Sequence, residues 1–127
     1  KDIFKTSKGK YVSPSPIEMK LSSNKNIEQV CVVGEGIPQP IALVTLSDTG
    51  KIKIAEELIN SLNETNDLVN SQLNNHEKLH NIIVLCDEWT VENKLLTPTM
   101  KIKRNSLEKM YKEYYPSWYD RDKVILL

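Results

Sequence analysis

One short stretch of the chain carries residue types suited to chemistry on a phosphate: LTPTMKIKR, residues 96–104. It places Lys101, Lys103 and Arg104 directly after a proline turn, in a chain whose formal net charge is zero. An ammonium group on a rigidly placed loop can follow a phosphate oxygen and stabilise negative charge that builds up there during a reaction. A run of charge is also often only a solvated face of a protein. The pattern alone leaves both interpretations open.

A second basic loop lies near the start of the chain. It gathers Lys5, Lys8 and Lys10 around Gly9. A glycine turn lets the backbone approach a ligand closely, and its N–H groups can face an anion. The loop is therefore a candidate anion-binding site, with a solvated surface as the ordinary alternative.

A zinc-hydrolase motif is matched literally by His76, Glu77 and His80 in HEKLH. In the H-E-x-x-H pattern, two histidines on one face of a helix bind zinc and the glutamate activates water. The motif needs a helix through both histidines, whereas His80 opens the apolar run NIIVLC, which is typical of a strand. We therefore expect a solvated helix end and no metal ligands, and keep a zinc hydrolase as a minor alternative.

Motifs that bind a nucleotide on their own are missing from the sequence. The stretch GEGIPQ, residues 34–39, lacks the third glycine of a dinucleotide fingerprint, and no phosphate-cradling G-K-[ST] occurs. Any nucleotide pocket must therefore be supplied mainly by another part of the protein.

Composition limits the functional classes. The 127 residues are 39% apolar and 27% charged, which suits one soluble domain. Seventeen basic residues balance seventeen acidic ones, so no overall charge attracts nucleic acid or anionic lipid. Cys31 and Cys86 lie in apolar runs and predict two buried thiols in a reducing compartment, and we expect a cytoplasmic protein. The chain opens with Lys1 rather than Met, which indicates a piece of a longer protein.

Apolar periodicity and turn signals predict the elements that position the two loops. The predicted strands are 2–6 and 10–12, forming an N-terminal hairpin, then 27–33, 40–46 and 80–87. The first predicted helix is short: Ser15 caps it, Pro16 is its first residue and Glu18 completes a capping box. A pair of helices is predicted over 54–73, with a break near Asn63. The last predicted helix covers 106–115 and is stopped by Pro116. The expected class is α+β: a small, mainly antiparallel sheet of about three core strands plus the hairpin, with helices packed on it.

Aromatic residues gather near the end of the chain: Tyr111, Tyr114, Tyr115, Trp118 and Tyr119. Packing in the core is the expected use of such side chains, because they bury large areas. Contact with a membrane is at most peripheral.

Three ordered segments carry a family pattern: KDIFKTSKGKYVSPSPIE, IEQVCVVGEGIPQPIALV and WTVENKLLTPTMKIKR. Together they resemble the C-terminal domain of AMP-forming acyl-CoA synthetases, most closely the long-chain fatty acid–CoA ligases. The resemblance covers nearly the whole chain. It implies that residues 1–127 are a single C-terminal lid domain, whose partner is the enzyme's own large N-terminal adenylation domain, absent from this sequence.

The resemblance implies a reaction in two steps. A fatty acid carboxylate attacks the α-phosphorus of MgATP to give acyl-adenylate and diphosphate, and the thiol of coenzyme A (CoA) then displaces AMP. Lys101 is implied as the catalytic lysine of the first step. ATP and Mg²⁺ are implied to be held mainly by the missing domain, so we expect residues 1–127 alone to be inactive. A non-catalytic module that binds CoA or a protein is the alternative within the same fold.

The resemblance also assigns roles at the start of the chain. Lys1 and Asp2 are implied to form the hinge about which the domain turns. The loop implied to line the tunnel for the pantetheine arm of CoA consists of Ser7, Lys8, Gly9 and Lys10.

Three further positions bear on the family pattern. Lys8 and Lys94 each replace a glycine that is usual in the family. For Arg104 two roles stay open: a structural role, or a contact with a phosphate of ATP or CoA.

Overall fold

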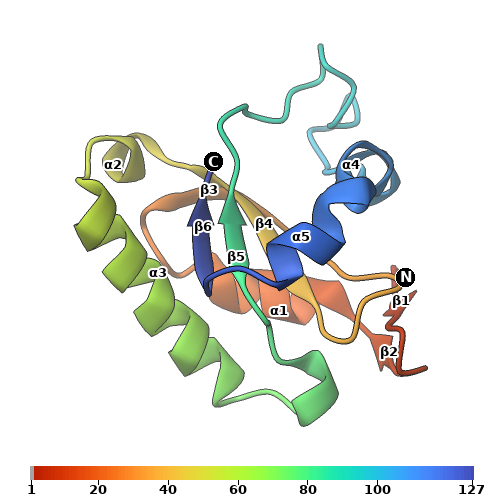
Figure 1. The fold of residues 1–127 in the computed structure, drawn as a ribbon. Coiled ribbons are helices and arrows are strands. Elements are labelled where there is room, and N and C mark those ends of the chain that lie inside the picture. Colours follow the sequence, from red (N-terminus) through yellow and green to blue (C-terminus); the bar gives the residue numbers. More distant parts are fainter. Residues whose placement is uncertain (1) are drawn as a thin grey trace.

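The structure, a computed structural model, describes residues 2–127 and has an α+β fold (Figure 1). Its strands are β1 (Phe4–Lys5), β2 (Tyr11–Val12), β3 (Ile27–Val33), β4 (Ile41–Leu46), β5 (Ile82–Val84) and β6 (Val124–Leu126). Its helices are α1 (Pro14–Leu21), α2 (Asp48–Lys51), α3 (Ala55–Asn70), α4 (Arg104–Tyr111) and α5 (Tyr115–Tyr119), with 3₁₀ turns η1 (Asn75–Glu77) and η2 (Lys112–Tyr114). Within these residues, no helix combines the length and the apolar character that crossing a bilayer requires.

The main sheet has four strands in the order β3-β4-β5-β6. Strands β3 and β4 are antiparallel, with Cys31 opposite Leu43, whereas β4 and β5 and also β5 and β6 pair in parallel. A parallel pair needs a long crossover connection, and α3 supplies it between β4 and β5. The α+β class and the separate β1–β2 hairpin are confirmed. The sheet is mixed rather than mainly antiparallel, and β6 is a fourth strand that the sequence analysis did not assign.

Two predicted helix boundaries were wrong. Helix α3 runs unbroken through Asn63 because its buried positions form one continuous stripe: Leu58, Leu62, Asn66 and Val69. Pro116 does not end the last helix. It lies in the first turn of α5. Backbone N–H groups in a first turn have no acceptor within the helix, so a proline there removes no hydrogen bond.

The start of α1 also differs from the prediction. The N-cap position is Ser13 and not Ser15, and no side chain caps the helix. Glu18 does not complete a capping box. Its carboxylate instead accepts a hydrogen bond from the backbone N–H of Val32 at 2.7 Å, which joins α1 to β3.

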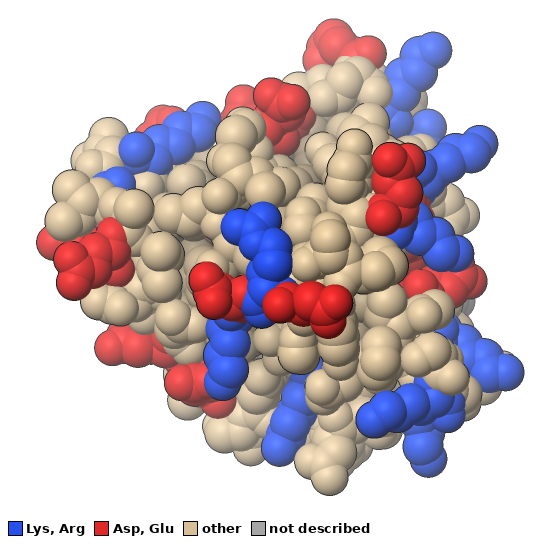
Figure 2. Space-filling view, viewed as in Figure 1, with Lys and Arg blue, Asp and Glu red and all other residues tan. Residues whose placement is uncertain are grey.

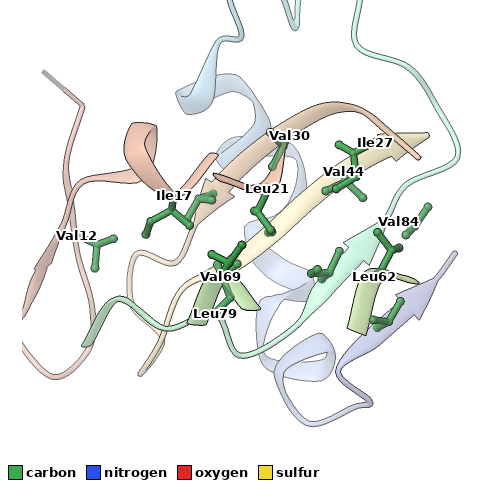
Figure 3. Close-up of a cluster of buried hydrophobic side chains, with 14 of the residues drawn as sticks. Val12, Ile17, Leu21, Ile27, Val30, Val44, Leu62, Val69, Leu79 and Val84 are labelled. Carbon is green, nitrogen blue, oxygen red and sulfur yellow. The ribbon is translucent and has the colours of Figure 1, made fainter. Parts of the chain in front are cut away.

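The sheet is covered on both faces because its strands alternate between two apolar clusters. Val30 and Val32 face the cluster that includes α1 and α3, while Cys31 and Val33 face the cluster that includes α4 and α5. Figure 3 shows the first cluster, in which side chains of α1, α3 and the strands point toward one another. The expected core role of the aromatic residues is confirmed in the second cluster, where Tyr115 and Trp118 are buried, although Tyr114 is exposed. The result is a three-layer arrangement.

The two cysteines differ in their surroundings. Cys31 is fully buried in β3, as predicted, but Cys86 is exposed. The apolar run that contains Cys86 outlasts the strand, because β5 ends at Val84. Cys86 therefore lies beyond the covered part of the sheet, where its thiol donates to the carbonyl of Leu127 at 2.8 Å.

The stripe on α3 leads to a direct test of the packing. Leu62 is fully buried and Leu68, on the same helix, is 62% exposed. We expect Leu62→Ala to lower the free energy of unfolding by about 2–5 kcal/mol, because it removes buried methyl groups and leaves a cavity. Leu68→Ala, the matched control, should change it by less than about 0.5 kcal/mol. Urea denaturation measures both, and equal losses would contradict the observed packing.

Candidate functional site

Lys101 lies at the base of a small hairpin, here called the lysine hairpin, residues 96–102. Its strands meet in an antiparallel bridge between Leu96 and Ile102. Inside the turn, the N–H of Thr97 donates to the carbonyl of Lys101 at 2.7 Å, and the N–H of Lys101 donates to Oγ1 of Thr97 at 3.0 Å. Met100 takes a left-handed conformation with φ of 70°, which closes the turn. The backbone of Lys101 is thus fixed on both sides.

The base of the lysine hairpin is anchored in the core. Leu95 and Leu96 are buried, and the N–H of Lys103 donates to the carbonyl of Leu95 at 2.9 Å. The preceding segment is held by Gln29 of β3, whose side chain exchanges two hydrogen bonds with the backbone of Trp89. The long connection from β5 to α4 therefore extends beyond the sheet but starts from fixed points (Figure 1).

The Lys101 side chain itself is exposed. Within residues 2–127 its ammonium makes no hydrogen bond and pairs with no carboxylate. A cation in this state is free to act on a group that belongs to another domain. Burial of Lys101 in the sheet would have ruled out the catalytic role predicted for it. Lys101 is exposed, so that role stays a prediction.

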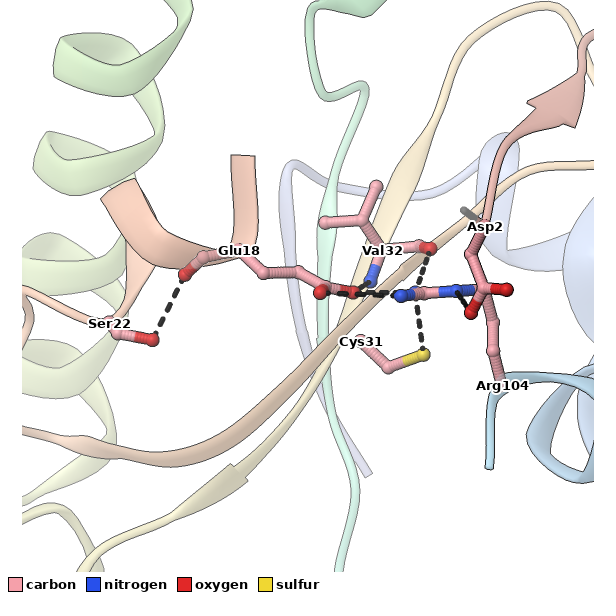
Figure 4. Close-up of polar contacts among 6 residues, drawn as sticks. All are labelled: Asp2, Glu18, Ser22, Cys31, Val32 and Arg104. Carbon is pink, nitrogen blue, oxygen red and sulfur yellow. Dashed lines mark hydrogen bonds and ion pairs between the residues drawn. The ribbon is translucent and has the colours of Figure 1, made fainter. Parts of the chain in front are cut away.

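Arg104, three residues after Lys101, has the opposite environment (Figure 4). Its side chain is 14% exposed, and its Nη1 lies 2.5 Å from Oε2 of Glu18, 2.8 Å from the carbonyl of Val32 and 3.1 Å from the sulfur of Cys31. Its Nη2 donates to Oε1 of Glu18 at 3.3 Å, and its Nε lies 3.5 Å from Asp2. The guanidinium is thus occupied within the domain, which favours the structural role of the two that the sequence left open.

The same contacts cover the outer edge of the sheet. Strand β3 is an edge strand, whose outward N–H and C=O groups would otherwise be available to another chain. At Val32, the carboxylate of Glu18 accepts from the N–H while Arg104 donates to the carbonyl. At Val32, two side chains therefore take the place of a neighbouring strand.

Burial in this region affects ionisable groups. It raises the pKa of the Cys31 thiol to about 12, a shift that nearby Arg104 opposes and Glu18 reinforces. Burial is also the main cause that raises the pKa of Glu108, against the hydrogen bond from Tyr115. Burial and the carboxyl group of Glu108 together raise the pKa of the Tyr115 hydroxyl. Cys31 is therefore a neutral thiol at physiological pH and competes with Glu18 for Arg104 only weakly.

The predicted pantetheine loop forms one tight turn, here called the glycine hairpin, residues 6–10. Ser7, Lys8, Gly9 and Lys10 are all exposed, and the turn is closed by the N–H of Thr6, which donates to the carbonyl of Lys10 at 2.9 Å. Gly9 has φ of 80°, a conformation that favours glycine. The glycine hairpin and the lysine hairpin lie well apart in Figure 1, so the structure does not bring the two predicted groups into one site.

The two lysines that replace family glycines are not equivalent. Lys8 is not among the residues with positive φ, so its backbone is compatible with a side chain. Lys94 has φ of 68°, in the left-handed region where glycine carries no steric cost. Replacement of the family's glycine by Lys94 therefore strains the backbone. Replacement of the family's glycine by Lys8 changes only the charge and bulk of the side chain.

The structure describes one of the two predicted hinge residues. Lys1 lies outside the described residues, while Asp2 is exposed and pairs with Arg104.

In HEKLH, the 3₁₀ turn ends at Glu77 and the backbone is extended at Lys78, so the helix that a zinc site needs is not formed. His80 stacks on the ring of Tyr119 with centroids 3.7 Å apart. Between residues 2 and 127, no group of three or more His, Cys, Asp or Glu side chains is placed to hold a metal ion.

Comparison with solved structures shows the same fold within larger proteins. The adenylation domain of a carboxylate reductase from Mycobacterium chelonae aligns with a TM-score of 0.80 and 22% identity, over 94% of this chain and 19% of its own. An acyl-CoA synthetase from Brucella canis aligns with a TM-score of 0.60 and 25% identity, over 90% of this chain and 20% of its own. This chain therefore shares its fold with about a fifth of each of these proteins.

Comparison of sequences identifies the family. The profile of the family described as AMP-binding enzyme C-terminal domain matches residues 1–123, and the chain belongs to this family. Mouse long-chain-fatty-acid–CoA ligase 5 is 28% identical over 94% of this chain and 20% of its own length. The ligase FadD15 of Mycobacterium tuberculosis is 24% identical over 96% of this chain and 23% of its own length. The chain thus spans about a fifth of the length of these curated relatives.

Removal of the Arg104 side chain should destabilise the domain strongly. We expect Arg104→Met to lower the free energy of unfolding by about 3 kcal/mol, because it leaves the largely buried carboxylate of Glu18 without its counter-charge. Lys103→Ala, at an exposed neighbour, should change it by less than about 0.5 kcal/mol. The double variant Arg104→Met with Glu18→Leu should recover part of the loss. Chemical denaturation measures all three, and equal effects of Arg104→Met and Lys103→Ala would refute the structural role.

The strain at Lys94 predicts a stabilising substitution. We expect Lys94→Gly to raise the free energy of unfolding by roughly 0.5–1 kcal/mol, because glycine adopts a φ of 68° without a steric cost. Lys8→Gly should give no such gain, since its backbone is not in that region. Thermal unfolding of both variants separates the cases, and a destabilised Lys94→Gly variant would contradict the observed conformation.

Proposed function

We propose that this chain is the mobile C-terminal catalytic domain of a long-chain fatty acid–CoA ligase. The enzyme would convert ATP, a fatty acid and CoA into acyl-CoA, AMP and diphosphate. The single observation that carries the proposal is the exposed ammonium of Lys101, which has no partner within residues 2–127, on a hairpin whose backbone is fixed at both sides. The family and the names of the relatives supply the reaction class.

The first step explains why the reaction needs a lysine. The oxygen of a fatty acid carboxylate forms a bond to the α-phosphorus of ATP while the bond to diphosphate breaks. Two negatively charged groups are forced together, so charge accumulates around the phosphorus. A preorganised cation stabilises that charge more strongly than it stabilises the separated reactants. In this proposal Lys101 supplies the cation, and ATP and Mg²⁺ are held mainly by the adenylation domain.

The second step uses a different face of the same domain. The sulfur of CoA attacks the acyl carbon of the adenylate, and AMP leaves with the electron pair of the broken bond. In this proposal Ser7, Lys8, Gly9 and Lys10 line the passage of the pantetheine arm. Because the glycine and lysine hairpins lie apart, one pose of the domain would present one hairpin, and rotation at Lys1 and Asp2 would present the other.

The proposal also covers where the enzyme works. Its partner is its own adenylation domain, and its substrates are a fatty acid and CoA. The balance of 17 basic and 17 acidic residues gives this domain no general affinity for nucleic acid or an anionic bilayer, so contact with a membrane would be peripheral. A cytoplasmic location fits this reading.

The role of Lys101 can be tested in the full-length protein that contains this chain. We expect Lys101→Ala to slow formation of acyl-adenylate by roughly 10²–10³-fold, because the transition state loses a preorganised cation. Conversion of supplied acyl-adenylate to thioester should persist, because that step does not use Lys101. Measurement of the two half-reactions separately, with Lys103→Ala as the matched control, decides the role. Survival of both half-reactions in Lys101→Ala would overturn it.

A further inference from the structure

One edge of the main sheet stays open beside the lysine hairpin, and the proposed function makes no use of it. Strand β3 is the edge strand, and at Val32 its outward backbone groups are occupied by Glu18 and Arg104. Successive residues of an antiparallel strand turn their N–H and C=O groups alternately toward and away from the neighbouring strand. The N–H and C=O of Val30, two residues before Val32, therefore point to the same open side.

Within residues 2–127, no strand lies beside the outward groups of Val30, and no side chain takes the place of one as at Val32. Opposite Val30 in the ladder lies Val44, whose carbonyl accepts from the N–H of Leu85 on its other side. Val30 is nevertheless only 7% exposed. A backbone donor and acceptor that are shielded from water and lack a partner are costly, so a ligand that pairs with them gains affinity.

A groove of about 490 Å³ follows this open edge. Its walls are formed by α1, β3 and the lysine hairpin, through residues that include Met19, Ser22, Glu28, Val30, Met100 and Ile102. A second depression of about 370 Å³ shares Glu28 and Met100 with the first and extends it to Glu92. The two depressions together are here called the edge groove. Met19 is 77% exposed and Met100 is 65% exposed, so the edge groove has an apolar side chain in each wall.

The charged residues that line the edge groove are all acidic. They are Glu18, Glu28, Glu88 and Glu92, and among the described residues no lysine, arginine or histidine joins them. Glu18 is occupied by Arg104, and Glu88 lies 3.9 Å from Lys51. Glu28 and Glu92 are exposed and pair with no cation within residues 2–127. Figure 2 shows basic and acidic side chains mixed over the face that it views, so a lining of one sign is a local feature.

We propose that the edge groove binds an extended basic segment of a partner protein, which pairs with β3 at Val30 as an added strand. Main-chain hydrogen bonds to an open sheet edge give such a complex its affinity, and pockets for alternate side chains give its specificity. Met19 and Met100 suit apolar side chains of the added strand, while Glu28 and Glu92 suit its lysine or arginine side chains. The inference goes beyond the proposed function and does not depend on it.

The acidic lining also disfavours a second copy of this chain as the occupant. Two copies joined edge to edge at Val30 would bring the same carboxylates together, above all Glu28 of each copy. Like charges on adjacent strands are destabilising, and charge on an edge strand protects it against pairing with itself. The edge groove therefore selects for a basic strand and against its own sequence.

Binding of a synthetic peptide to the full-length protein that contains this chain tests the proposal. The probe is a short peptide of alternating lysine and valine with blocked ends, followed by fluorescence anisotropy. We expect Glu28→Lys to raise its Kd by roughly 3- to 10-fold, because a charge in the edge groove is reversed, and Glu28→Gln to raise it less. Glu64→Lys is the matched control, because Glu64 is exposed on α3 outside the edge groove, and its Kd should equal that of the wild type.

The peptide itself tests the backbone pairing. Methylation of its central peptide nitrogens removes the N–H groups that strand addition needs and leaves its charge unchanged, so binding should weaken by roughly 10-fold or more. A peptide of alternating glutamate and valine should not bind. Binding that methylation leaves unchanged would indicate charge attraction alone and overturn the proposal.

Three further results would also overturn the proposal. The first is a wild-type protein that does not bind the lysine–valine peptide. The second is an equal Kd in Glu28→Lys and Glu64→Lys. The third is a dimer in analytical ultracentrifugation that Glu28→Lys dissociates, which would identify a second copy as the occupant.

Discussion

The guanidinium of Arg104 links three elements that are distant in sequence. Its partner Glu18 is 86 positions away on α1, and the carbonyl of Val32 that it contacts belongs to β3. Arg104 begins α4, and Lys101 precedes it by three residues. Together with the buried Leu95 and Leu96, this side chain therefore helps to fix the position of the lysine hairpin relative to the sheet. A shift of Arg104 would move the hairpin and also expose the edge of β3.

The energetics of this arrangement explain why it specifies one structure. Taking the charges of Arg104 and Glu18 out of water is costly, so the pair adds little stability compared with apolar residues of similar size. An alternative packing that separated them would leave a buried charge without a partner, which costs far more. The neutral thiol of Cys31, whose pKa burial raises to about 12, adds a weak acceptor and no competing charge. The pair thus acts mainly by making other arrangements of the loop unfavourable.

Local patterns were enough to predict much of the fold and the exposure of the site. The apolar runs of β3 and β4, the turn at Gly9 and the solvated Lys101 each follow from residues close in sequence. The role of Glu18 could not be predicted, because its partner is 86 positions away and a capping box was the nearest local explanation. The parallel pairing of β5 was missed for the same reason: strand direction depends on the crossover through α3, not on the strand's own residues.

The two hairpins are attached to one packed body, and this constrains how the proposed reaction can work. The glycine hairpin is braced by the turn after β3, and the lysine hairpin is anchored by Leu95 and Arg104. Both hairpins are therefore fixed to the same packed body. If both hairpins serve one adenylation domain, the whole domain must turn between the two steps, and withdrawal of Lys101 accompanies entry of the glycine hairpin. Asp2 pairs with Arg104 at the first residue of α4, so the hinge proposed at Lys1 and Asp2 would lie beside the segment that follows the lysine hairpin.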